Sequence, residues 1–292
     1  MRLKVVVDCY SGLPNPEFEL DEEEAGPLLA RMRSASPMRA ARALPSPYWL
    51  GYRGLELRPV DPSPALRAVP PWRVYLGQVT GPDRVPRQLG SAFEESIFAE
   101  GGPVAETAPD AQRMFVRATR EARAGDTGSP PVPRSPAYVG FSDVGSPPVF
   151  EPGWWNDGGV KQLFNNCYNY STDYRTDTFA QPGRASGRAI RRLACADIKP
   201  LALLDGMEDA PLSNNVFPPS GHLVALVIAP GFDFHWYRKG VGGLWSHKVG
   251  PGPATALDNA GQLIWDPRVA QRGPYSDFCG FLTVHHGHIK LG

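Results

Sequence analysis

The sequence has no excess of either charge and no long apolar run. Its 292 residues include 30 Lys and Arg against 30 Asp and Glu, so the formal net charge is zero. Proteins that bind nucleic acids or anionic membranes usually carry a basic surplus, which this chain lacks. No segment approaches the roughly 18 consecutive apolar residues that a membrane-spanning helix needs. We therefore expect neither a nucleic-acid partner nor a membrane partner, and the sequence leaves the oligomeric state open.

Cysteine is scarce and scattered. The four cysteines are Cys9, Cys167, Cys195 and Cys279, and no two of them stand in a Cys-x-x-Cys pattern. This spacing excludes a zinc knuckle and a dense disulfide framework. Residues 1–8 are interrupted by charge too early to form a secretory signal. We therefore expect free thiols and a cytoplasmic protein, while export without a cleavable signal stays open.

Proline and glycine, in contrast, are abundant. The 32 Pro and 31 Gly predict many loops. Seven Trp, ten Tyr and thirteen Phe nevertheless supply the apolar bulk of a folded core, so the prolines punctuate a folded chain rather than a disordered one. For this length, two domains are more usual than one.

The first part of the chain, residues 1–124, predicts a small α+β accessory unit. A Val-rich alternating stretch predicts a strand over 3–8, and Asp21 with Glu24 forms a capping-box pattern before a helix over 21–33. Further strands are predicted near 48–57 and 72–79, and helices near 90–99 and 109–123. This part contains no histidine, because all six follow residue 221. We therefore expect the chemistry elsewhere.

Residues 125–150 are rich in Pro, Gly and Ser. Such a composition resists both helix and sheet pairing, so it predicts a connector between two domains. An ordered strap over the surface is the alternative, because Tyr138 to Phe141 offer apolar anchors. The remaining residues, 151–292, form the second predicted domain.

The second domain carries three consecutive strand patterns. Residues 221–229 form a continuous apolar run of strand length, which is typical of a strand buried on both faces. A second strand is predicted over 233–238 and a third over 244–248, with a hairpin turn between them. Antiparallel neighbours lie within about 5.5 Å of each other, so His235 on the second strand can meet His247 on the third.

Cys167 is the candidate nucleophile. The residues after it can begin a helix, and a helix N-terminus lowers the pKa of a thiol. A thiol also needs an imidazole to take its proton and a further group to orient that imidazole, roles that suit His235 and His247. Asn165 and Asn166 could donate amide hydrogens to an oxyanion. The competing interpretation is a small buried thiol beside two turn-forming asparagines.

This order of motifs resembles the core of NlpC-type cell-wall peptidases and, more loosely, of papain-like cysteine hydrolases. The resemblance covers about residues 160 to 250 and implies that Cys167 is the nucleophile, His235 the base and His247 its orienting residue. The family's usual Asp-Cys-Ser-Gly is replaced here by Asn166-Cys167-Tyr168-Asn169. The Asn-Asn-Cys-Tyr-Asn-Tyr and His-Trp-Tyr-Arg stretches are also similar to those of uncharacterised bacterial proteins, which implies a common domain and no activity.

Other residues offer competing assignments. Asp258 or Asn259 could complete a Cys, His, Asn order, but an Asx turn before a glycine explains them as well. His222 fits a strand end and Cys279 fits a core position. The tail contains His285, His286 and His288 at metal-binding spacing, but it has no carboxylate or thiol nearby in the sequence, so adventitious affinity is the simpler explanation.

The sequence as a whole predicts an α+β protein whose second domain has a central antiparallel sheet and a papain-like or NlpC-like arrangement. The predicted activity is thiol-dependent hydrolysis or transfer at an amide bond of a peptide-like substrate, through an acyl-enzyme on Cys167, with Trp236 near the substrate and with no cofactor or metal. The alternative is a non-catalytic binding or structural protein on the same scaffold. Its partner would contact an aromatic surface formed by Trp154, Trp155, Trp236 and Trp245.

Overall fold

The computed structural model describes residues 1–39, 49–60, 70–105, 108–123, 147–211 and 213–292. The predicted connector, 125–150, lies outside these residues except for its last four positions. The chain forms two compact units, and each of them is made of three separate segments of the chain. The first contains Met1–Cys9, Asn15–Ser46 and Gly51–Gly128, and the second contains Tyr10–Pro14, Pro47–Leu50 and Ser129–Gly292.

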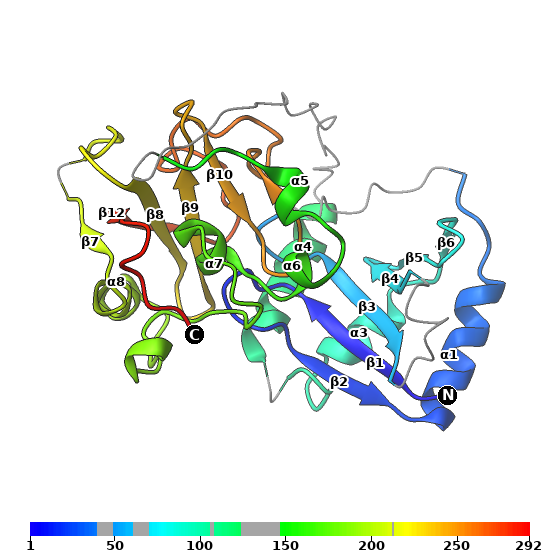
Figure 1. Cartoon of the computed structure of the whole chain (residues 1–292). Helices are drawn as coiled ribbons and strands as arrows, with labels where there is room; N and C mark the ends of the chain where they lie inside the picture. The colour runs from blue at the N-terminus through cyan, green and yellow to red at the C-terminus, as the bar shows by residue number, and fades with distance from the viewer. Residues whose placement is uncertain (40–48, 61–69, 106–107, 124–146, 212) are drawn as a thin grey trace. The chain divides into compact units, whose positions relative to one another are not determined.

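The first unit is built on a six-stranded antiparallel sheet of order β2-β1-β3-β4-β5-β6 (Figure 1). Its strands are β1 (Leu3–Asp8), β2 (Glu17–Leu20), β3 (Gly54–Pro59), β4 (Trp72–Tyr75), β5 (Gln78–Thr80) and β6 (Pro86–Gln88). Its helices are α1 (Glu22–Ser34), α3 (Ala92–Phe98) and α4 (Pro109–Arg123). The strand predicted over 48–57 is confirmed only in its second part, because β3 begins at Gly54. Strand β2 was not predicted.

Helix α1 begins as the sequence predicts. The Asp21 carboxylate accepts hydrogen bonds from the backbone N–H groups of Glu23 and Glu24, and the Glu24 side chain accepts from the Asp21 N–H. This reciprocal pair satisfies donors that the helix itself leaves without partners, so the helix start is fixed locally.

The second unit contains a six-stranded antiparallel sheet of order β11-β10-β9-β8-β12-β7. Its strands are β7 (Glu208–Asp209), β8 (His222–Ala229), β9 (Asp233–Lys239), β10 (Trp245–Lys248), β11 (Ala254–Thr255) and β12 (Asp277–Val284). Its helices are α5 (Pro152–Trp155), α6 (Val160–Leu163), α7 (Cys167–Thr172) and α8 (Cys195–Leu204), with one 3₁₀ turn over Arg184–Ser186. The three strands predicted over 221–248 are therefore confirmed.

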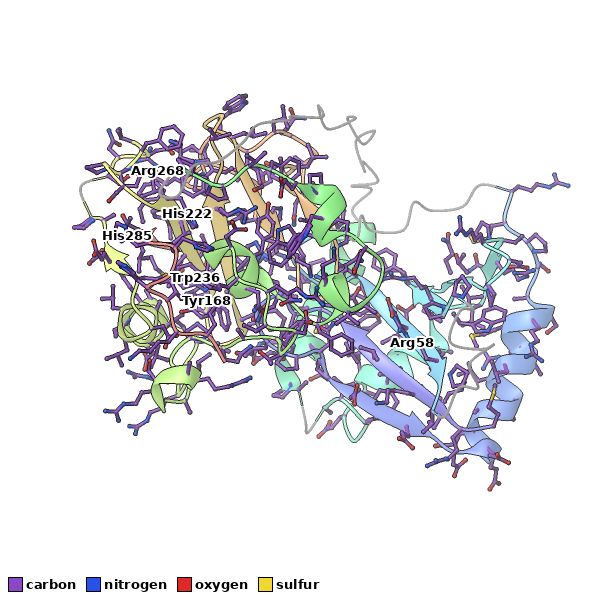
Figure 2. All side chains as sticks on the ribbon, viewed as in Figure 1. Arg58, Tyr168, His222, Trp236, Arg268 and His285 are labelled. Carbon is purple, nitrogen blue, oxygen red and sulfur yellow. A yellow bond between two sulfur atoms is a disulfide. The ribbon has the colours of Figure 1, made fainter. Side chains whose placement is uncertain are left out.

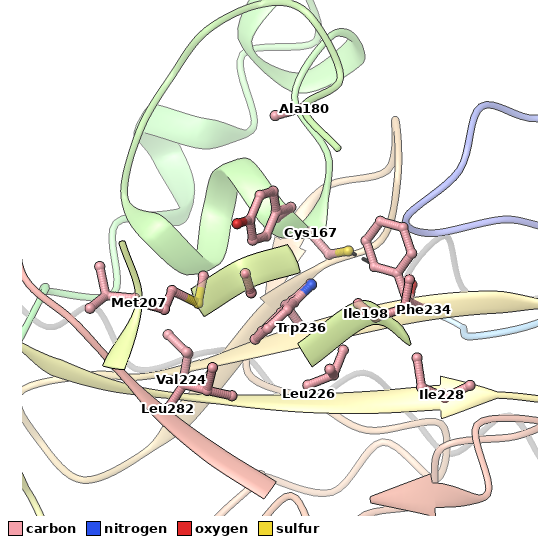
Figure 3. Close-up of a cluster of buried hydrophobic side chains, with 13 residues drawn as sticks. Cys167, Ala180, Ile198, Met207, Val224, Leu226, Ile228, Phe234, Trp236 and Leu282 are labelled. Carbon is pink, nitrogen blue, oxygen red and sulfur yellow. Dashed lines mark hydrogen bonds between the residues drawn. The ribbon is translucent and has the colours of Figure 1, made fainter. Parts of the chain in front are cut away.

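The core of the second unit lies between this sheet and two helices. Strand β8 is buried along its whole length, as its continuous apolar run predicts. Cys167 of α7 and Ile198 of α8 pack against Leu226 of β8 and against Phe234 and Trp236 of β9 (Figure 3). The same cluster fixes where α7 begins relative to β9.

The described residues thus form a mixed protein with two antiparallel sheets and seven α-helices, so the α+β class and the central antiparallel sheet are confirmed. The narrower papain-like arrangement stays a prediction. No helix in the described part of the chain combines the length and the apolar character needed to cross a bilayer.

Candidate functional site

Cys167 is the first residue of α7, so the predicted helix start is confirmed. Asn166 caps the helix: its side-chain oxygen accepts from the N–H groups of Tyr168 and Asn169 at 3.0 and 3.1 Å. The side chain of Asn169 accepts in turn from the Asn166 N–H at 3.1 Å. This capping box, in which asparagine replaces the more usual acidic or glutamine residue, holds the thiol at a fixed position beside β9.

The amides of Asn165 and Asn166 already have partners inside the protein. The Asn166 NH₂ group donates to the carbonyl oxygens of Gly12 and Ala180, both at 2.8 Å. The Asn165 NH₂ group donates to the Lys161 carbonyl at 2.9 Å and to the Asp177 carboxylate at 2.8 Å. Both side chains therefore shape the turn before Cys167, and the oxyanion role stays a prediction.

His235 and His247 meet across the β9–β10 hairpin, as their spacing predicts. The Nε2 atom of His235 lies 2.8 Å from Nδ1 of His247, and Nε2 of His247 lies 2.9 Å from the carbonyl oxygen of Leu257. Both rings are fully buried. The pair is therefore anchored at one end by a backbone carbonyl.

Ser11 completes the group, and the sequence reasoning missed it. Its hydroxyl forms a short hydrogen bond with Nδ1 of His235 and also lies within hydrogen-bonding reach of the Cys167 thiol. Ser11 and His235 are 224 positions apart. Ser11 follows the first strand in a Ser-Gly-Leu-Pro turn, and no local pattern distinguishes it from any other turn residue. Only the fold brings it to the imidazole.

For neutral rings, the hydrogen bonds assign the tautomers of His247 and His235. A carbonyl oxygen only accepts, so Nε2 of His247 must carry a hydrogen, and Nδ1 of the neutral ring must accept. Nε2 of His235 is then the donor to His247, which leaves its Nδ1 as the acceptor of the Ser11 hydroxyl hydrogen. The Cys167 thiol donates to the Phe234 carbonyl oxygen, 4.0 Å away, and lies within hydrogen-bonding reach of the same hydroxyl. The result is one directional chain from Ser11 through His235 and His247 to Leu257, with Cys167 beside its first member.

Burial decides the electrostatics of this site. Cys167 is 0% exposed, and desolvation raises the pKa of its thiol, with the nearby Asp233 carboxylate adding to the increase. The predicted lowering of this pKa by the helix start is therefore wrong, because the penalty for a buried thiolate exceeds the favourable helix dipole. Desolvation also lowers the pKa of His247 to about 4, so this ring is neutral near pH 7.

Asp233 holds the segment that contains Ser11. Its carboxylate accepts hydrogen bonds from the N–H groups of Ser11, Gly12 and Leu13 at 2.6, 3.1 and 3.1 Å. The Tyr275 hydroxyl donates to the same carboxylate at 2.5 Å. Despite these donors, burial raises the pKa of Asp233 to about 6. One buried carboxylate thus organises three consecutive backbone amides.

Lys248 supports the turn on the other side of Cys167. Its buried ammonium donates to the carbonyl oxygens of Gln162, Asn165 and Gly250, and desolvation lowers its pKa to about 7. The side chain ties the end of β10 to the residues that precede α7. Its role is to order the backbone around the site.

The competing candidates have structural partners. The Asp258 carboxylate accepts from the N–H groups of Ala260, Gln262 and Gln271, each at 2.9 Å, as in the predicted turn. His222 begins β8 and contacts the Ser171 carbonyl oxygen at 2.7 Å. In the tail, His285 lies 3.3 Å from the Glu208 carboxylate, and the ring of His286 stacks on Tyr174. The described residues contain no group of three His, Cys, Asp or Glu side chains that could hold a metal ion.

The aromatic surface predicted for the binding alternative does not form. Trp155, Trp236 and Trp245 are buried, and only Trp154 of the four is exposed. Trp236 packs beside Tyr168 with 5.5 Å between the ring centroids (Figure 2). Its place in the core also removes the basis for a substrate contact at this residue.

Cys195 and Cys279 form a disulfide that joins the first residue of α8 to β12. The expectation of four free thiols is therefore wrong for this pair, and it holds for Cys9 and Cys167, which are both buried. The 84-residue separation gave no spacing motif from which the bond could be predicted.

Comparison with known proteins gives one informative relationship. Insoluble matrix shell protein 1 of Ruditapes philippinarum is 47% identical over 137 residues, which make up 46% of this chain and 88% of that protein. No family model and no solved structure matches the chain.

Two expectations from the sequence are corrected by this relationship. The resemblance to NlpC-type hydrolases and to bacterial proteins is wrong as a statement of kinship, because nearly half the chain matches a protein named for a shell matrix. The cytoplasmic location inferred from residues 1–8 is contradicted by the same finding. Short motifs around Cys167 and His235 are too few to define a family when the residues between them do not follow that family's pattern.

Proposed function

This chain belongs to the family of insoluble matrix shell protein 1, and from that membership we propose that it is a non-catalytic structural protein of an extracellular matrix. The observation that carries the proposal is the 47% identity over 88% of that relative. A structural role was the alternative that the sequence left open.

The disulfide between Cys195 and Cys279 supports an extracellular location. Such bonds persist in oxidising surroundings and are rare in the reducing cytoplasm. Here the bond ties a helix to the central sheet, which suits a protein that must last outside the cell.

The burial of Cys167 supports a role without catalysis. The thiol is 0% exposed, its pKa is raised, and its neighbours Asn165 and Asn166 use their amides inside the protein. A nucleophile has to reach its substrate and has to ionise. Burial of the thiol opposes both, which supports a packing role for these polar groups in the second unit.

The second candidate function is a thiol-dependent hydrolase or transferase with a papain-like arrangement of α7 and the sheet. One observation favours it: the hydrogen-bonded order of Ser11, His235 and His247, with the Cys167 thiol within reach of Ser11. A fold that carries such an order does not thereby carry the activity.

Fractionation of the producing tissue or culture tests the proposal. The protein is quantified by mass spectrometry in the cytosol, in the soluble extracellular material and in the detergent-insoluble extracellular material, with a known cytosolic enzyme as the control. We expect enrichment in the insoluble extracellular fraction and an intact Cys195–Cys279 peptide pair in the absence of reductant. Recovery with the cytosolic enzyme, with both cysteines reduced, would remove the proposal.

A further inference from the structure

Residues 10–14 form a short loop that belongs to the second unit, although the segments on both sides of it belong to the first. The loop follows β1 and has no regular secondary structure. Its backbone enters the second unit at Ser11 and Gly12, which are fully buried, while Pro14 is exposed. We call residues 10–14 the cover segment.

Polar and apolar contacts both hold the cover segment. The Asp233 carboxylate accepts three of its consecutive N–H groups, and the carbonyl oxygen of Gly12 accepts from the side chains of Asn166 and Gln181, both at 2.8 Å. Tyr10 packs on the ring of Phe232 at 4.7 Å between centroids, and Leu13 touches the core cluster. One carboxylate thus accepts from three consecutive residues of the segment.

The cover segment inserts one hydroxyl between a thiol and an imidazole. Ser11 donates to Nδ1 of His235 and contacts Cys167 with the same oxygen atom. The thiol itself donates to the Phe234 carbonyl oxygen, 4.0 Å away (Figure 3), and the backbone of Trp236 also lies within hydrogen-bonding reach of the sulfur atom. Nδ1 of His235 is already the accepting nitrogen, because its Nε2 hydrogen is committed to His247. The imidazole is thus set up to take a proton, and Ser11 occupies that nitrogen.

We propose that the cover segment masks a latent nucleophilic site: when residues 10–14 leave the second unit, Cys167 and His235 form a reactive thiol–imidazole pair that attacks soft electrophiles and acyl donors. This activity lies beyond the structural role and does not depend on it. The cover segment has no regular secondary structure, and such segments open at lower free energy than a core strand does.

Once the pair is uncovered, the chain itself supplies the groups that the proton transfer needs. The thiol hydrogen of Cys167 passes to Nδ1 of His235, which leaves a thiolate and an imidazolium. The Nε2–H of the imidazolium keeps its hydrogen bond to His247, which remains neutral. With iodoacetamide as the probe, the thiolate forms an S–C bond, iodide leaves with the electron pair of the C–I bond, and the imidazolium releases its proton to water.

Alkylation of the full chain tests the proposal. Asp233→Ala removes the acceptor of three cover-segment amides, and the matched control is Asp258→Ala, which removes the acceptor of three amides in the 258–271 loop. Labelling of Cys167 by iodoacetamide is followed by mass spectrometry without denaturant. We expect Asp233→Ala to label at least about tenfold faster than the wild type, and Asp258→Ala to stay within about twofold of it.

The role of the His235 imidazole is tested in the Asp233→Ala variant, in which the cover segment is expected to be released. Adding His235→Gln to Asp233→Ala is expected to slow labelling of Cys167 by about tenfold, because the proton acceptor is lost. Equal rates with and without His235 would overturn the thiol–imidazole pair. Equal rates of Cys167 labelling for Asp233→Ala and Asp258→Ala would overturn the proposal that the cover segment shields this thiol.

The wild-type protein supplies a test that needs no folded variant. Cys167 is alkylated at rising urea concentrations below the unfolding transition, which is monitored by tryptophan fluorescence. Opening of a five-residue segment exposes little surface, so we expect a labelling rate that hardly depends on urea in this range. A rate that rises as steeply as global unfolding would overturn the proposal, since the thiol would then react only in the unfolded chain.

Discussion

At His247 one neutral side chain both accepts and donates a hydrogen bond in the protein interior. Nδ1 accepts from His235 and Nε2 donates to the Leu257 carbonyl oxygen. Glutamine has the same pair of groups on one amide, an oxygen that accepts and an NH₂ that donates. His247→Gln is therefore a variant that can keep both bonds and lose the titration.

We expect His247→Gln to fold and to be less sensitive to acid than the wild type. Burial lowers the pKa of His247 to about 4 from the ordinary 6.5, so between these values the unfolded chain binds a proton that the folded chain does not. The free energy of unfolding should then fall as pH falls through this window, by roughly 1.4 kcal/mol per pH unit from this group alone. Urea unfolding at a series of pH values measures the slope.

The difference between the two proteins isolates His247. Desolvation also lowers the pKa of His222 to about 4, and this group contributes the same slope to both proteins. If wild type and His247→Gln lost stability equally between about pH 6.5 and 4, the ring would not be neutral in the folded state.

Cys167 shows which residue properties the sequence predicts and which it does not. Its place at a helix start follows from the local pattern after it, and the structure confirms it. The direction of its pKa shift depends on whether water reaches the sulfur atom, and that is set by β9 and by Ser11. These neighbours are distant in the chain, so local reasoning took the helix dipole into account and missed the desolvation.

At the scale of elements, α7 depends on the cap that Asn166 provides. We expect Asn166→Ala to lower the free energy of unfolding by about 2 kcal/mol or more, because the cap and two hydrogen bonds to buried carbonyl oxygens are lost together. The matched control is Ser91→Ala at the start of α3, where the serine side chain makes no capping hydrogen bond. Urea unfolding should leave this control within about 0.5 kcal/mol of the wild type.

The disulfide fastens α8 to the central sheet. Replacing both Cys195 and Cys279 by serine is expected to reduce the free energy of unfolding by about 2 to 4 kcal/mol, because the unfolded chain regains the freedom of an 84-residue loop. Urea unfolding of the wild type with and without reductant gives the control. Reductant should destabilise the wild type and leave the double variant unchanged. Equal effects on both would mean that this bond does not form in the protein.

The elements were predicted best where one local pattern determines them. The apolar run that becomes β8 and the capping box before α1 carry their own evidence, and both form as expected. The strand expected over 48–57 was placed too early, because its first aromatic residues resemble a strand whereas the pairing partners of β1 begin at Gly54. The disulfide could not be predicted either, since its cysteines meet only after α8 packs on the sheet.

At the scale of the whole molecule, neither compact unit is one continuous stretch of the chain. The sequence predicts a boundary near residue 125, but the second unit also includes Tyr10–Pro14 and Pro47–Leu50. Composition changes along a chain indicate linkers, and they carry no information about a short loop that is inserted elsewhere. Ser11 therefore lay outside any sequence-based account of the site around Cys167.

The insertion of the cover segment can be tested at Gly12, which packs against Phe234 of β9. A Cβ atom at this position would lie 2.5 Å from the ring of Phe234 and 2.6 Å from its carbonyl oxygen, so alanine does not fit without a backbone shift. We expect Gly12→Ala to weaken the second unit by about 1 to 3 kcal/mol, seen as faster hydrogen exchange in β8 and β9. Gly153→Ala in α5 is the matched control, because a Cβ atom there meets nothing within 4 Å. Unchanged exchange in β8 and β9 after Gly12→Ala would mean that the loop shifts away from Phe234 without disturbing the sheet.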